Sequence, residues 1–164
     1  MAVTIEKESY TRALLDEILP LGRKCWSEST VDKADSCAYY GERDFAIEPD
    51  IEQYERIASM GMMAILTLRE ERVLKGYIVA FTHQALHHKG ILCAVIDTIF
   101  VEPDYRAYTA VLTERLEKEL QALGVHMIGW PTHVRGPVHE ILEARGYVAD
   151  DIVMEKRLCV SQQQ

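Results

Sequence analysis

The chain has 164 residues, enough for one domain with a buried core and too few for two domains of ordinary size. Hydrophobic residues make up 48% of the sequence, but no apolar run approaches the length that crosses a bilayer. The formal net charge of -8 argues against nucleic acid as the main partner, because phosphate binding needs clustered Lys and Arg. The acidic balance suits a cationic substrate such as an amine.

The first ten residues carry charges where a signal peptide would have an apolar stretch. The four cysteines are scattered, with no CxxC pair and no zinc-ligand spacing. We therefore expect a cytoplasmic protein with free thiols and no metal. Residues 1–160 are predicted to form a single domain, and residues 161–164 a frayed tail.

The first third of the chain predicts a short strand and two helices. The strand covers Val3–Ile5, and Ser9 follows it as the N-cap of a helix that runs to about Arg23. From Cys25 to Pro49 the periodic pattern gives way to a polar, acidic loop. A second amphipathic helix follows Pro49 and closes at Gly61.

The middle of the chain is rich in β-branched residues and predicts three strands. They cover Met63–Leu68, Val73–His83 and Ile91–Val101, and they are separated by short polar connections. Consecutive strands with such short connections form an antiparallel meander.

The last third predicts a helix, a strand, a second helix and a final strand. A stripe of Leu112, Leu116, Leu120 and Leu123 marks the first helix, which stops at Gly124.

The other three elements are expected at Val125–Trp130, at Pro137–Arg145 and near Ile152–Leu158. The crossover from 91–101 through the helix to 125–130 makes these two strands parallel. A helix that starts just past a strand end offers backbone N–H groups to an anion, so we expect the chemistry at this crossover.

Two motifs carry a family resemblance. The stretch Asp97–Arg106 resembles the strand and Pro-x-Tyr-Arg turn of the GNAT acetyltransferases, and Ile141–Tyr147 resembles their closing helix and Gly-Phe turn. The order of elements agrees with that superfamily over nearly the whole chain. The resemblance implies an α/β (α+β) fold with a mixed, mostly antiparallel central sheet of 6–7 strands. Helices would cover both faces, and a parallel strand pair would splay apart at the cofactor cleft.

The resemblance also implies acetyl-CoA as co-substrate. The acetyl group would pass to a primary amine by direct attack on the thioester. The pantetheine amides would pair with the backbone of Ile99, Phe100 and Val101, whose N–H groups would also stabilise the oxyanion. The pyrophosphate would lie against the helix start formed by Arg106, Ala107, Tyr108, Thr109, Ala110 and Val111.

This chain departs from the family pattern in three places. The segment 106–111 contains no glycine, so Thr109 would offer its hydroxyl and Arg106 its charge to the phosphates. Arg135 stands where the family has an asparagine, and it could reach a CoA phosphate. Leu142 occupies the position of the family's tyrosine acid.

The catalytic base is expected to be Asp97, because an ammonium must lose a proton before it attacks. Asp97 interrupts an apolar strand, where burial would raise its pKa. A structural role in the sheet is an equally open alternative. His133, in the loop after residues 125–130, is a further acid or base candidate, with an ordinary loop histidine as the alternative.

The amine would meet the acidic loop. Glu28 is the residue singled out there for binding a cationic substrate, although a solvated loop explains most of the other acidic residues. The alternative function is a catalytically degenerate GNAT-fold protein that binds acyl-CoA or a protein partner without transfer. Pairing or exchange of the last strand would make a homodimer.

Overall fold

The protein was analysed as a computed structural model, which describes residues 2–30, 49–131 and 137–149, with the side chains of 26–30 and 137 excepted. In chain order the elements are β1 (Val3–Glu8), α1 (Arg12–Thr30), α2 (Ile51–Ser59), β2 (Met63–Glu70), β3 (Val73–Gln84), β4 (Leu92–Val101), the 3-10 helix η1 (Pro103–Tyr108), α3 (Thr109–Ala122), β5 (Met127–Gly129) and α4 (Pro137–Ala144). No helix in these ranges is long and apolar enough to span a membrane.

The strands form one sheet in the order β1-β2-β3-β4-β5. The first four pair antiparallel, and β4 pairs parallel with β5. The predicted meander and the predicted parallel pair are therefore confirmed. Five of the expected six to seven strands lie in the described ranges, and the strand predicted near Ile152–Leu158 lies outside them.

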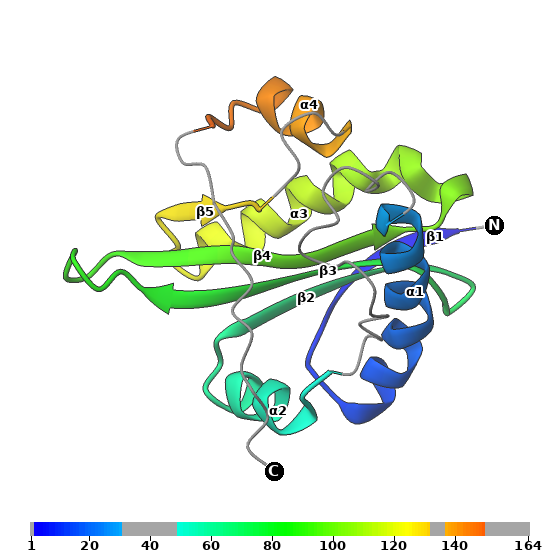
Figure 1. Cartoon of the computed structure of the whole chain (residues 1–164), viewed down its shortest axis with the longest axis horizontal. Coiled ribbons are helices and arrows are strands. Elements are labelled where there is room, and N and C mark those ends of the chain that lie inside the picture. The colour runs from blue at the N-terminus through cyan, green and yellow to red at the C-terminus, as the bar shows by residue number, and fades with distance from the viewer. Residues whose placement is uncertain (1, 31–48, 132–136, 150–164) are drawn as a thin grey trace, which may run out of the picture.

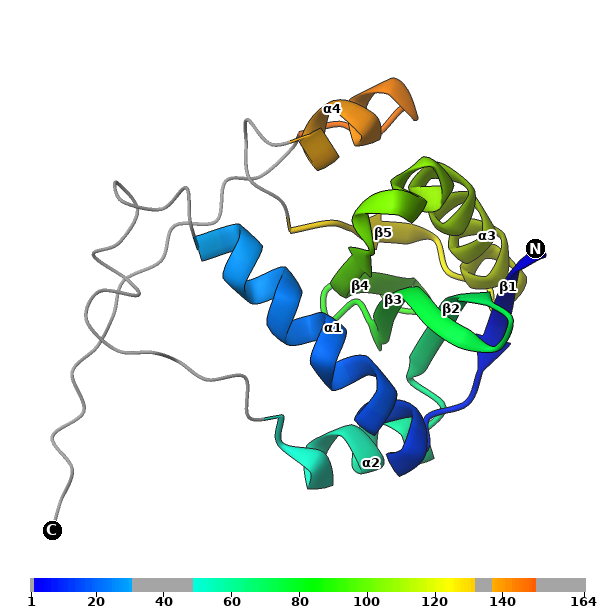
Figure 2. The same ribbon diagram turned by 90° about the vertical axis from the view of Figure 1, so that its right-hand side faces the viewer.

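Helices cover both faces of the sheet, as Figures 1 and 2 show. On one face α3 packs the leucine stripe Leu112, Leu116 and Leu120 into the core, each at most 1% exposed. On the other face α1 packs against Tyr77 and other residues of the sheet. Residues of a strand alternate between faces, so each strand contributes to both cores. The mixed α/β fold class expected from the sequence is confirmed.

Two details of the predicted helices are wrong. The N-cap of α1 is Thr11 and not Ser9, because the Thr11 hydroxyl accepts the Leu14 N–H at 3.1 Å. Leu123 belongs to the predicted leucine stripe but is 49% exposed, because α3 has ended there.

Helix α1 also extends past Arg23 to Thr30, into residues expected to form a loop. Two long-range contacts tie this extension to the sheet. Lys24 Nζ lies 2.5 Å from Glu102 Oε1, and Cys25 Sγ donates to Ile99 O at 3.7 Å. Tertiary contacts of this kind override local sequence preference.

A β-bulge interrupts the pairing of β3 with β4. Val79 lies opposite Thr98, and the next pair is Ala80 with Ile96, so Asp97 has no partner across the strand. A bulge of this kind bends the strand and redirects side chains. Here it changes which residues of β4 point to which face.

Candidate active site

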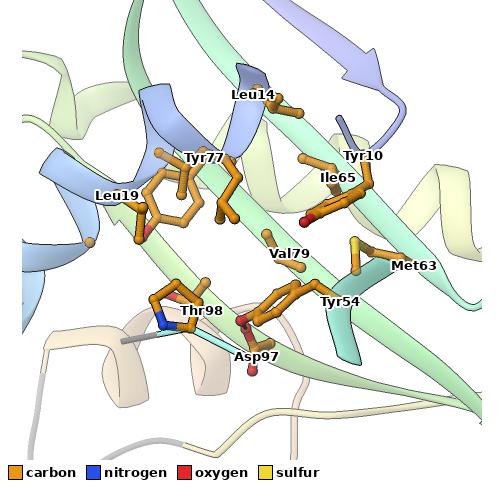
Figure 3. Close-up of a pocket in the computed structure, with 14 residues that line it drawn as sticks. Tyr10, Leu14, Leu19, Tyr54, Met63, Ile65, Tyr77, Val79, Asp97 and Thr98 are labelled. Atoms are coloured by element: carbon orange, nitrogen blue, oxygen red, sulfur yellow. Dashed lines mark hydrogen bonds between the residues drawn. The ribbon is translucent and has the colours of Figure 1, made fainter. Parts of the chain in front are cut away.

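A cavity of about 150 Å³ lies between the sheet and helices α1 and α2. Its walls are mostly aliphatic, and three tyrosines, one threonine and one aspartate complete them (Figure 3). The lining residues are Tyr10, Leu14, Leu15, Ile18, Leu19, Gly22, Pro49, Tyr54, Met63, Ile65, Tyr77, Val79, Asp97 and Thr98.

The bulge places Asp97 in this cavity. Ile96 and Ile99 pack in the α3-side core, whereas the two residues between them, Asp97 and Thr98, both line the cavity on the opposite face. In a regular strand, neighbouring side chains would point to opposite faces. The extra residue therefore brings a carboxylate and a hydroxyl together at one point of the cavity wall.

Tyr54 of α2 contacts the carboxylate directly. Its hydroxyl donates to Asp97 Oδ2 at 3.3 Å, and Figure 3 shows it pointing toward Asp97. The Tyr54 ring stacks on Tyr10 at 6.2 Å between centroids and meets the edge of Phe81 at 5.9 Å. Burial, and then the nearby charge of Asp97, raises the pKa of Tyr54, so its phenol stays protonated.

The surroundings of Asp97 favour a proton acceptor. The residue is exposed at the cavity wall, and the protein around it replaces part of the hydration of the carboxylate. This desolvation raises the pKa of Asp97, and the hydrogen bond from Tyr54 partly opposes the rise. A carboxylate with a raised pKa is a stronger base than a solvated one and is suited to take a proton from an ammonium.

Two further tyrosines complete the polar groups of the cavity. Tyr77 is 1% exposed, and burial raises its pKa to about 12. Its hydroxyl lies close to the position that a Cβ atom of residue 22 would occupy. The glycine at position 22 of α1 therefore leaves space for it. The hydroxyl oxygen of Tyr10 is buried and has no hydrogen-bond partner in the described part of the chain.

Strands β4 and β5 separate close to Asp97. Their pairing covers only Cys93–Val95 and Met127–Gly129, whereas β4 continues to Val101. Within the described ranges, no strand pairs with β4 on its β5 side beyond Val95. This free strand edge is a fit for the amide groups of a pantetheine arm, which pair like an added strand.

The residues predicted to bind that arm lie on this part of β4. Phe100 and Val101 are buried, at 5% and 6% exposure, and Ile99 is half-buried. The Ile99 carbonyl accepts a hydrogen bond from the Cys25 thiol, as described above. An S–H donor is weak, so an amide N–H would replace it readily.

The segment predicted to hold the pyrophosphate is helical throughout. Residues 103–108 form η1, which leads directly into α3, and the Thr109 N–H donates to Arg106 O. That amide is already used within the chain. Arg106, Ala107, Tyr108, Ala110 and Val111 are exposed, and Thr109 is half-buried.

Other predicted site residues lie apart from the cavity or outside the described ranges. His133 and Arg135 lie outside the described residues, as does the Glu28 side chain. Leu142, at the position of the family's tyrosine acid, is 4% exposed in α4. No group of three or more His, Cys, Asp or Glu residues that could hold a metal ion occurs in the described ranges.

Known structures resemble this chain over nearly its whole length. The aminoglycoside acetyltransferase meta-AAC0020 from an uncultured soil metagenomic sample, in complex with sisomicin, matches with a TM-score of 0.71 and 11% identity over 97% of both chains. The aminoglycoside acetyltransferase AAC(6')-Iy, in complex with the bisubstrate analogue CoA-S-monomethyl-acetylneamine, matches with a TM-score of 0.65 and 15% identity over 95% of this chain and 99% of that one.

A ribosomal-protein-alanine N-acetyltransferase from Brucella melitensis biovar Abortus 2308 matches with a TM-score of 0.60 and 16% identity over 97% of this chain and 100% of that one. The chain has the GNAT fold. No protein-family model matches the sequence, and no curated protein sequence matches it significantly.

The sequence predicts Asp97 as a site residue, and the structure adds to it three tyrosines of the same cavity that the sequence did not indicate. Tyr54 belongs to the amphipathic helix predicted after Pro49, and an apolar helix face does not distinguish a core residue from a site residue. Tyr10 and Tyr77 come from other parts of the chain and meet Tyr54 only in the folded sheet. Their shared signal is the residue type, since a tyrosine on an apolar face brings a polar hydroxyl into the core.

Proposed function

We propose that the protein is an acetyl-CoA-dependent N-acetyltransferase that acts on a primary amine. The observation that carries this proposal is the position of Asp97. Its bulge lies just past Val95, where β5 leaves β4, and its side chain lines a mostly apolar cavity. Asp97 therefore lies between the cavity, which would hold the amine, and the free edge of β4, which could pair with acetyl-CoA.

The chemistry follows from that placement. Asp97 takes a proton from the substrate ammonium, and the free amine attacks the thioester carbonyl carbon. The C–N bond forms, the C–S bond breaks, and the departing CoA thiolate takes up the proton that the attacking nitrogen releases. Tyr54 orients the Asp97 carboxylate through its hydrogen bond. Backbone N–H groups of residues 99–101 are the donors proposed for the oxyanion.

The contacts to acetyl-CoA are proposed from the free edge of β4 and from the exposed cation Arg106. Thr109 and its neighbours in residues 107–111 would lie beside the phosphates. The acidic composition supports a cationic acceptor and makes nucleic acid an unsuitable one. A cytoplasmic location, a homodimer and roles for Glu28, His133 and Arg135 remain predictions.

Calorimetric titration with acetyl-CoA tests the cofactor part of the proposal. We expect micromolar binding that weakens about tenfold in Arg106→Ala, because one charge-assisted contact to phosphate is lost. Arg115→Ala is the matched control, since Arg115 is exposed on the same helical segment and pairs with Glu119. Equal affinity of both variants for acetyl-CoA would show that Arg106 does not contact the phosphates.

The alternative is a GNAT-fold protein without transferase activity. The helical, glycine-free segment with its occupied Thr109 amide favours this alternative. Absence of acetyl-CoA binding to the wild-type protein would support it and would contradict the proposed enzyme.

A further inference from the structure

The cavity beside Asp97 limits the size of the acceptor. Its volume of about 150 Å³ equals that of an apolar protein cavity that holds one benzene molecule. A single aromatic ring or a branched aliphatic group of that size would fill it. A three-ring aminoglycoside would not enter it.

The cavity offers one charged partner to a cationic acceptor. Among the described residues that line it, Asp97 is the only charged one. The walls facing Asp97 are aliphatic or aromatic, including Leu14, Ile65 and Val79. A second ammonium group against these walls would be buried without a partner, which is strongly unfavourable. A monoamine fits, whereas a polyamine does not.

We propose that the acceptor is a small primary monoamine with one aromatic or branched aliphatic body. The amine nitrogen lies at Asp97 and Tyr54, and the body lies between α1 and β2–β3. This inference rests on the proposed acetyltransferase function and specifies the substrate class of the same site.

The first test compares amines of different charge and size. Acetyl transfer from acetyl-CoA is measured with phenethylamine, tyramine, spermidine, a lysine-containing peptide and sisomicin. We expect kcat/KM for the two arylalkylamines to exceed those for the three larger or polycationic amines at least tenfold. Transfer to sisomicin, spermidine or the peptide but not to the monoamines would overturn the substrate class and leave the proposed function intact.

Filling the cavity provides an independent check. Ile18→Phe adds volume at a half-buried lining position and should weaken both arylalkylamines, whereas Leu123→Phe, at an exposed position on another element, should not. If no amine is acetylated, calorimetric titration of tyramine into the protein without acetyl-CoA measures amine binding directly. Binding that is lost in Asp97→Asn would support the cavity as a monoamine site even though the transferase proposal had failed. No binding in that titration would overturn the inference as well.

Discussion

The two faces of the sheet hold different kinds of pocket. On the α3 face, Leu112, Leu116 and Leu120 pack against the strands and are at most 1% exposed, and an open pocket of about 390 Å³ lies beyond them, lined by polar residues of α3 and of the segment after α4. On the face covered by α1 and α2, a cavity remains, and it contains a carboxylate and an unpaired hydroxyl. The same strands supply both faces, since buried Ile78 belongs to the first and its neighbours Tyr77 and Val79 to the second.

This difference separates the parts of the molecule that hold the fold from those proposed to perform chemistry. The polar groups of the α1/α2 face show the same separation. Buried Arg69 is fully engaged by Glu8 at 2.8 Å and Glu17 at 2.7 Å, and it pairs with Leu74, away from the β3–β4 bulge at Val79 and Ala80. Tyr10, which lines the cavity, has no such partner. Incomplete packing and incomplete pairing thus coincide at the candidate active site.

The largest expected effect is on activity, from Asp97→Asn. Loss of a general base should lower kcat about 10²- to 10⁴-fold. The same change should raise Tm at neutral pH. Because desolvation raises the pKa of folded Asp97, the ionised carboxylate destabilises the folded protein once the pH has risen through that pKa. Glu55→Gln, at an exposed position on α2 next to Tyr54, is the control. Reduced activity together with reduced Tm would indicate a structural role for Asp97.

The next effect is on stability and distinguishes the two faces. Leu116→Ala should lower the free energy of unfolding by about 2–5 kcal/mol, because it opens a cavity in a filled core. Ile18→Ala, at a half-buried position that already borders a cavity, should cost roughly 1 kcal/mol. Urea unfolding of both variants measures the difference. Equal costs would show that the α1/α2 face is as tightly packed as the α3 face.

The smallest effect compares two tyrosine hydroxyls. Tyr10→Phe removes an unpaired hydroxyl and should leave the free energy of unfolding unchanged or raise it by about 1 kcal/mol. Tyr147→Phe removes a hydroxyl that donates to Glu117 Oε1 at 2.9 Å and should cost about 1–2 kcal/mol. A clear loss of stability in Tyr10→Phe would mean that its hydroxyl has a partner.

The sequence predicted the strands, the parallel pair and the leucine helix because each has a strong local pattern. It also identified Asp97, since a carboxylate in an apolar strand is unusual. It did not predict the bulge, because a bulge depends on how β3 and β4 pair and not on one strand's residues.

The tyrosine cluster was missed for a related reason. Tyr10, Tyr54 and Tyr77 are far apart in the chain, and only the folded sheet brings them to Asp97. The extension of α1 to Thr30 likewise depends on contacts with distant residues, including Glu102. Local patterns thus predicted the elements, whereas the site arises from their assembly.

The pH dependence of kcat/KM for acetyl transfer to an arylalkylamine tests whether Asp97 is the base. We expect an acidic limb on which kcat/KM rises as Asp97 ionises, with an apparent pKa above the ordinary aspartate value of 3.8. This limb should disappear in Asp97→Asn. A limb that persists unchanged in Asp97→Asn would contradict the assignment of Asp97 as the base.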